Sequence, residues 1–235
     1  MQKEEKLSVV FSSKNDGMAN KEFIEHIKST CGYGAHVFHI HNPNGVSLTK
    51  IYSEMLSSKD DDSDIVIFIH DDVEFLKNGW GKEIVRLFKE NKDYGIIGVA
   101  GAAQFDQNGA WWNYEKKYGQ VLHRHDGKSW LTAFSPLLDH DLQETVVVDG
   151  LFIAVKKDRI SKSFDTKIEG FDFYDIDFSL ANHLDGKCKV GVTTNIRMAH
   201  NSIGELKQTW YTNRELVTQK YKDFLPIDIE NKKKK

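Results

Sequence analysis

The chain has 235 residues, of which 40% are hydrophobic and 29% are charged, as is typical of one globular α/β domain with a single large core. Its formal net charge of −3 provides no overall attraction to nucleic acid or anionic lipid, so any phosphate must be held by a local site. Cys31 and Cys188 are far apart and form no CxxC pair, which argues against a zinc knot, a redox motif or a disulfide scaffold and favours a reducing compartment.

The first hundred residues alternate between strand and helix patterns. Apolar runs predict strands over residues 7–11, 37–41, 65–69 and 94–100. Apolar residues at helical spacing predict helices near residues 20–31, with Asn20 as the cap, and over residues 48–56 and 80–88. The run at 65–69 is typical of a strand covered on both faces. This order predicts a Rossmann-like, mostly parallel sheet flanked by helices, with ligands bound beyond the carboxyl ends of its strands.

The second half has a different character. Glycines, histidines and tryptophans replace clean periodicity over residues 104–144, which we interpret as an aromatic-rich insertion. After it we expect strands over 145–156 and 189–200 and helices over 173–184 and 205–224. The tryptophans could stack on sugar rings or fill a small core, and core packing is the commoner outcome for aromatic side chains.

The two ends of the chain suggest a protein of the cytoplasm. The charged start and the short apolar run at 7–11 do not resemble a signal peptide or a membrane span. The tail Lys232–Lys235 is the only basic run, and a frayed end is favoured over weak membrane contact.

Asp71 and Asp72 follow the predicted strand at 65–69 directly. Carboxylates at a strand end face the binding crevice of such a sheet and are suitable ligands for Mg²⁺ or Mn²⁺. The adjacent His70 would suit Mn²⁺. The alternatives are a solvated acidic turn and a histidine with a structural hydrogen bond.

A second group of carboxylates, Asp172, Asp175 and Asp177, precedes or begins the helix at 173–184. One of them could act as a general base, but capping of the helix N-terminus explains carboxylates there equally well. Residues two apart on a helix do not share a face, so Asp175 and Asp177 should have different roles. Helical periodicity places Asp177 near the edge of the buried stripe and Asp175 on the far side, and leaves open which of them lines the cleft.

Histidines mark two further strands. His200 ends the predicted strand at 189–200, where a structural histidine is the simpler interpretation. His39 and His41 share one strand face without a third nearby ligand, so we assign them to packing or polar contacts.

Taken in order, these motifs resemble the GT-A glycosyltransferases of the family-2 type, in particular a bacterial subgroup of glycosyltransferase-like proteins linked to surface polysaccharide assembly. The resemblance covers most of the chain. It is carried by the segments FIHDDVE (68–74), GVAG (98–101), GAWW (109–112), VDG (148–150), FYDIDF (173–178) and HNSIG (200–204).

The resemblance implies one GT-A-type domain over residues 1–235. Residues 1–103 would bind the nucleotide sugar, residues 104–204 would bind the acceptor and carry the catalytic groups, and 205–235 would form a C-terminal helix and tail. The His-Asp-Asp motif at 70–72 would occupy the place of the DxD motif of such enzymes, with a divalent cation, Mn²⁺ or Mg²⁺, as cofactor.

Individual roles follow from the same resemblance. Asp72 would coordinate the metal, with His200 completing the site and His70 in the position of the first DxD aspartate. Asp175 would be the catalytic base, with Asp177 in reserve. The remaining assignments are Ser12, Ser13, Asn42 and Asp71 for donor binding, and Trp112 and Asp149 for acceptor binding.

The predicted function is therefore transfer of a sugar from a nucleotide sugar to a glycan or lipid-linked acceptor, with inversion, in surface polysaccharide biosynthesis. We expect no nucleic-acid partner, and the C-terminal helix with its lysines could contact the inner face of the membrane. The alternatives are a sugar-nucleotide-binding relative without turnover, a metal-dependent phosphoester hydrolase and, least favoured, a structural interaction protein. Donor base, sugar, linkage and oligomeric state stay open.

Overall fold

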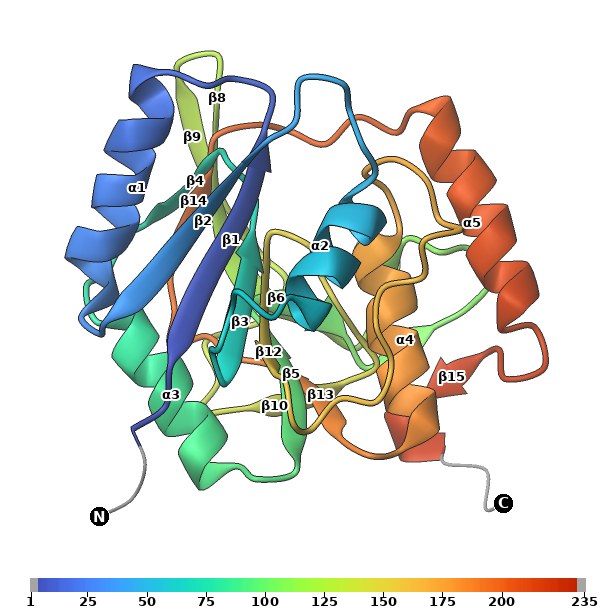
Figure 1. The fold of residues 1–235 in the computed structure, drawn as a ribbon. Helices are drawn as coiled ribbons and strands as arrows, with labels where there is room; N and C mark the ends of the chain where they lie inside the picture. The colour runs from blue at the N-terminus through green and yellow to red at the C-terminus, as the bar shows by residue number, and fades with distance from the viewer. Residues whose placement is uncertain (1–3, 232–235) are drawn as a thin grey trace.

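A seven-stranded sheet runs through the middle of the protein (Figure 1) in a computed structural model that describes residues 4–231. The strand order is β10-β13-β5-β12-β3-β1-β2. Strands β1, β2, β3, β5 and β13 are parallel, whereas β10 and β12 run against their neighbours. The strands cover Leu7–Ser13 (β1), Ala35–His41 (β2), Ile65–Ile69 (β3), Tyr94–Gly98 (β5), Gln143–Thr145 (β10), Phe152–Lys156 (β12) and Lys189–Val192 (β13).

A second sheet begins where strands of the first one end. Its order is β11-β6-β8-β14-β4, with β9 paired to β8, and a separate two-stranded sheet joins β7 to β15. The chain passes from β3 into β4, from β5 into β6 and from β13 into β14, so the carboxyl ends of three parallel strands lead into the second sheet. The bounds are Val73–Phe75 (β4), Ala100–Ala102 (β6), Gln104–Phe105 (β7), Lys117–His125 (β8), Lys128–Ala133 (β9), Val147–Val148 (β11), Met198–His200 (β14) and Ile227–Asp228 (β15).

Helices cover both faces of the main sheet (Figure 1). The α-helices are Met18–Cys31 (α1), Leu48–Ser57 (α2), Trp80–Glu90 (α3), Tyr174–Asp185 (α4) and Gln208–Lys220 (α5), with short 3₁₀ turns at Trp111–Asn113 and Ile229–Asn231. Alternating strand residues face opposite sides. On β1, Val9 packs in the core with Ile27 of α1 and Ile84 of α3, whereas Val10 packs in the core with Tyr52 of α2. The α/β fold expected from the sequence is confirmed.

Several sequence predictions need correction. Helix α1 begins at Met18, with Gly17 as N-cap, and Asn20 is not the cap. The side chain of Asn20 instead turns toward Ser13 and His39. The single strands expected over 94–100, 145–156 and 189–200 are each broken, because the chain leaves one sheet and enters the other within these segments.

The segment 104–144 contains a hairpin that periodicity did not reveal. Strands β8 and β9 pair along six residues each, and Asp126 and Gly127 form their turn with φ angles of 49° and 70°. Two consecutive positive φ angles define a type I′ turn, for which Asp-Gly is a favoured sequence. The middle of the predicted insertion, residues 117–133, is thus a β-hairpin.

No helix within residues 4–231 is long and apolar enough to cross a membrane. The basic tail Lys232–Lys235, for which weak membrane contact was one interpretation, lies outside the described residues.

An ion pair between the buried carboxylate of Asp177 and the exposed Lys220 fixes α5 against α4. Asp177 of α4 has only 1% of its surface exposed, and its Oδ1 accepts hydrogen bonds from Lys220 Nζ at 2.7 Å and from the Tyr221 hydroxyl at 2.9 Å. Lys220 also pairs with Asp165 at 2.8 Å. A buried carboxylate needs such partners, so these contacts hold α4, whose first turn also carries Asp175, in one position.

Replacing Lys220 by methionine should destabilise the protein by roughly 2 kcal/mol, because the Asp177 carboxylate would keep its buried position and lose a charged donor. Urea denaturation would measure the change in the free energy of unfolding. Lys222→Met, at an exposed position next to the same helix, is the matched control. Equal stability of the Lys220 and Lys222 variants would contradict a structural role for the pair.

Candidate active site

Three polar side chains from distant parts of the chain meet at the junction of the two sheets. His70 follows β3, Asp72 lies in the turn before β4, and His200 ends β14. One possible ligand atom from each lies within 4.8 Å of the others. Asp72 Oδ1 is 3.2 Å from His200 Nε2, and His70 Nδ1 is 3.4 Å from the same nitrogen. Two imidazoles and one carboxylate form a donor set suited to a divalent transition metal such as Mn²⁺.

Electrostatics within this cluster favour an ionised carboxylate. Burial alone would raise the pKa of Asp72, but hydrogen bonds from His200 and Ser202 and the charge of His200 lower it to about 2. Burial opposes charge on His200, yet Asp72 and the nearby Asp149 and Asp71 raise its pKa. Burial and the neighbouring His200 lower the pKa of His70, which favours its neutral form.

The cluster stands between two cavities. His70 and His200 line both of them, as do Phe171 and Gly204. The first cavity, of about 440 Å³, lies at the ends of β1 and β3 and includes Ser12, Ser13, Asn42, Asp71 and Asp72. The second, of about 710 Å³, lies on the side of β8 and α4 and includes Asp149 and Asp175. The structure thus brings the expected donor residues together in one cavity and the expected acceptor residues in another.

The side chains of two residues in the first cavity form hydrogen bonds with the backbone of neighbouring loops. Both polar atoms of the Asn42 side chain bond to the backbone of Val46, at 2.8 and 2.7 Å. Ser13 Oγ donates to the carbonyl of Asn15 at 2.7 Å and lies 3.0 Å from His39 Nε2. Ser13 and Asn42 therefore stabilise the loops that form the cavity wall.

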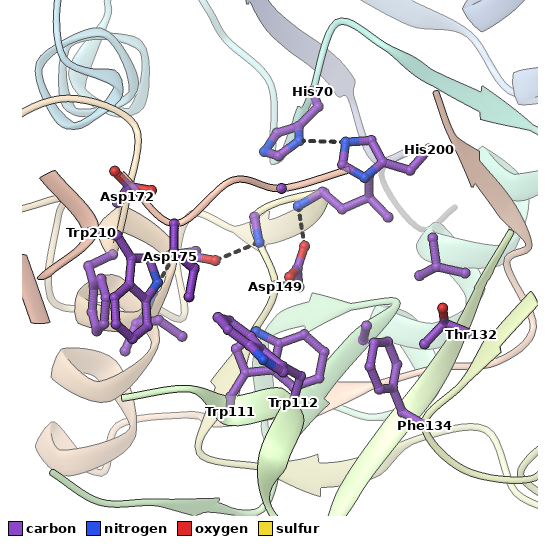
Figure 2. A pocket seen from close by; sticks show the side chains of 18 of the residues that line it. His70, Trp111, Trp112, Thr132, Phe134, Asp149, Asp172, Asp175, His200 and Trp210 are labelled. Atoms are coloured by element: carbon purple, nitrogen blue, oxygen red, sulfur yellow. Dashed lines mark hydrogen bonds between the residues drawn. The ribbon is translucent and has the colours of Figure 1, made fainter. Parts of the chain in front are cut away.

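The second cavity has aromatic walls (Figure 2). Trp111 and Trp112 meet edge to face, with ring centroids 6.1 Å apart and an interplanar angle of 83°. Trp210 of α5 lies 6.0 Å from Trp112. Figure 2 shows these tryptophans on one side of the cavity and His70 and His200 on the opposite side. Flat apolar surfaces combined with a few fixed polar groups are typical of a site for a small ligand.

Asp175 projects into the second cavity from the first turn of α4. Its Oδ2 accepts a hydrogen bond from the Gly150 N–H at 2.7 Å, and its Oδ1 accepts one from Ile176 at 2.8 Å. Burial, followed by the negative charge of Asp149, raises the pKa of Asp175 to about 7, although the two N–H donors oppose the shift. Such a carboxyl group can accept a proton near neutral pH.

The two candidate bases on α4 have different surroundings. Asp177 is buried against α5 and lines neither cavity, whereas Asp175 faces the second cavity. Trp111 was expected only as one of the tryptophans that stack on sugar rings or fill a core, and Trp210 and His123 had no expected role in a site, but all three line this cavity. The two adjacent tryptophans in the sequence, Trp111 and Trp112, could have indicated that Trp111 lies in the site. The other two depend on tertiary contacts that periodicity does not report.

The fold is the mixed α/β fold of GT-A glycosyltransferases. The model of a glycosyltransferase-like family matches residues 8–221, so the chain belongs to that family. No curated protein matches the sequence.

Solved structures with the same fold are glycosyltransferases of distant sequence. The chain is similar to S. aureus TarS, with 11% identity and a TM-score of 0.55 over 96% of this chain and 41% of that chain. It is similar to the catalytic domain of Drosophila β1,4-galactosyltransferase 7 in complex with xylobiose, with 12% identity and a TM-score of 0.52 over 89% and 79%. It is also similar to the mannosyltransferase PcManGT from Pyrobaculum calidifontis in complex with GDP-Man and Mn²⁺. The identity is 8% and the TM-score is 0.52, over 91% of this chain and 61% of that chain. At these identities the likeness shows the fold alone.

The Asp175 carboxyl group should titrate near pH 7, and Asp149→Asn should shift its titration to lower pH. The substitution removes the neighbouring negative charge, while its amide oxygen can still accept the Leu151 N–H bond made by Asp149 at 2.9 Å. Carbon-13 NMR of labelled aspartates would measure both titrations, with Asp175→Asn identifying the signal. A titration near the ordinary aspartate value of about 3.9 would contradict the description of this group.

Proposed function

We propose that this protein transfers a sugar from a nucleotide sugar to an acceptor hydroxyl, with inversion at the anomeric carbon. The observation that carries the proposal is the position of the cluster of His70, Asp72 and His200 between two cavities, one of which holds Asp175. A reaction that joins two substrates needs two adjoining sites with the reacting groups at their junction.

The first cavity is the proposed donor site, where a divalent cation would be held by Asp72, His200 and His70. Asp71 and Asp72 both line this cavity, and two carboxylates would repel a diphosphate unless a cation offsets their charge. A bound Mn²⁺ or Mg²⁺ would also stabilise negative charge on the departing nucleoside diphosphate. Ser12, Ser13 and Asn42 line the part of the cavity proposed for the nucleoside.

Asp175 is the proposed general base. Its raised pKa of about 7 makes the carboxylate a better proton acceptor than an ordinary aspartate while a large fraction stays ionised at neutral pH. The N–H groups of Gly150 and Ile176 hold both oxygens, so the carboxylate is oriented before the acceptor arrives. Asp175 would take the proton of the acceptor hydroxyl as that oxygen attacks the anomeric carbon, which gives inversion in one displacement.

The proposed acceptor is a sugar without negative charge. Asp149, Asp172, Asp175 and Glu205 line the second cavity and would repel an anionic group. Among the described lining residues Lys117 is the only lysine or arginine, and its Nζ donates to the Trp112 carbonyl at 2.8 Å. The apolar face of a sugar ring would pack against Trp112, and Asp149 would accept bonds from its hydroxyls. We further propose that the acceptor is a glycan or a lipid-linked sugar at the cytoplasmic face of the membrane, and that the reaction is a step of surface polysaccharide biosynthesis.

Calorimetric titration with UDP, GDP, CDP and dTDP, each with Mn²⁺ and again with EDTA, tests the donor site. We expect one nucleotide to bind in a metal-dependent way, and binding to be lost in Asp72→Ala, because the carboxylate that holds the cation is removed. Asp175→Asn should retain nucleotide binding, since it lies in the other cavity, and should lower acceptor-dependent transfer by roughly 10²–10⁴-fold.

Other outcomes would replace the proposal. Release of nucleoside diphosphate at the same rate with and without acceptor would indicate a phosphoester hydrolase. Metal-dependent nucleotide binding without transfer to any acceptor sugar would indicate a relative without turnover. Absence of binding to all four nucleotides would exclude the proposed donor site.

A further inference from the structure

The hydroxyl group of Tyr174 lies between the metal cluster and the backbone that holds Asp175. Tyr174 is 3% exposed, and its oxygen is 2.9 Å from His70 Nε2 and 3.1 Å from the carbonyl oxygen of Gly150. The N–H of the same Gly150 donates to Asp175 Oδ2 at 2.7 Å. One buried hydroxyl therefore touches a proposed metal ligand and the residue that orients the proposed base.

Counting hydrogens assigns the direction of these bonds. A tyrosine hydroxyl has one hydrogen, and a carbonyl oxygen can only accept, so the hydrogen of Tyr174 points to Gly150. The Tyr174 oxygen then accepts a hydrogen bond from His70, which requires a proton on His70 Nε2. In a neutral imidazole the other nitrogen, Nδ1, is unprotonated. His70 Nδ1 is the atom that lies 3.4 Å from His200 Nε2, inside the cluster.

We propose that Tyr174 is a positioning residue that holds His70 in the tautomer whose Nδ1 can bind the metal. The inference rests on the metal site proposed above. A hydrogen bond to the far nitrogen of a histidine fixes both the tautomer and the ring orientation, and such outer contacts commonly change metal affinity by about 10–100-fold. The unprotonated Nδ1 of His70 would then join Asp72 and His200 as a ligand of the proposed metal.

The packing at Gly150 further supports this role. A Cβ atom at Gly150 would lie 2.0 Å from the Tyr174 hydroxyl oxygen and 2.6 Å from Cζ of the same ring. Any other residue at 150 would displace the hydroxyl from His70. The position thus requires glycine because the Tyr174 ring packs against its α-carbon.

Mn²⁺ binding to the full chain, followed by the loss of the free-ion EPR signal without nucleotide, tests the inference. Tyr174→Phe removes the hydroxyl and should weaken Mn²⁺ binding about 10–100-fold, and Gly150→Ala should do the same by moving the ring. Tyr33→Phe, which removes a half-buried hydroxyl that donates to the Glu5 carbonyl away from α4, and Gly34→Ala, where a Cβ meets no atom within 4 Å, are matched controls that should bind like wild type.

A second measurement uses the metal-free wild type and needs no substitution in the network. Nitrogen-15 NMR of labelled histidines distinguishes the two neutral tautomers, and we expect His70 to carry its proton on Nε2. A proton on Nδ1, or Mn²⁺ affinity of Tyr174→Phe within twofold of wild type, would overturn the role of Tyr174 and leave the proposed function intact. Failure of the wild type itself to bind Mn²⁺ would instead overturn the metal site of the proposed function.

Discussion

The pairing of β14 with β4 is the interaction on which the site depends. His200 is 130 residues from His70 along the chain, and it reaches the cluster because His200 is in register with Val73. The N–H of Asn201 donates to the carbonyl of Asp72 at 2.9 Å, which closes the pair beside the proposed ligands. Backbone hydrogen bonds of a ladder fix side-chain position more firmly than a loop does, so this short antiparallel pair builds the cluster of His70, Asp72 and His200.

Asp175 and Asp177, two positions apart at the start of α4, have different roles. Asp177 turns into the core and holds α5 through Lys220 and Tyr221. Asp175 turns into the cavity, where burial and Asp149 raise its pKa to about 7. Because one carboxylate anchors the helix, the other can sit in surroundings that destabilise its charge without loss of position. The same chemical group serves folding in one place and, we propose, catalysis in the other.

The parts of the fold predicted well from sequence were those with a local signal. The apolar run at 65–69 coincides with β3, and the position of Asp72 after it followed from the end of that strand. The choice between Asp175 and Asp177 was not predictable from periodicity, because periodicity states which residues share a face and not what covers that face. His200 as a cluster member came from the family resemblance, since by itself it favoured a structural role. The role of Tyr174 depends on Gly150, and no local pattern reports that contact.

The central claim is that His70, Asp72 and His200 together hold a divalent cation between donor and acceptor. A crystal structure of the protein with Mn²⁺ and the nucleoside diphosphate that it binds, with anomalous data recorded at the manganese edge, tests this claim most directly. We predict an anomalous peak within coordination distance of His70 Nδ1, Asp72 and His200 Nε2, with the diphosphate in the cavity at the ends of β1 and β3. A peak at other residues, or a diphosphate bound elsewhere, would contradict the account.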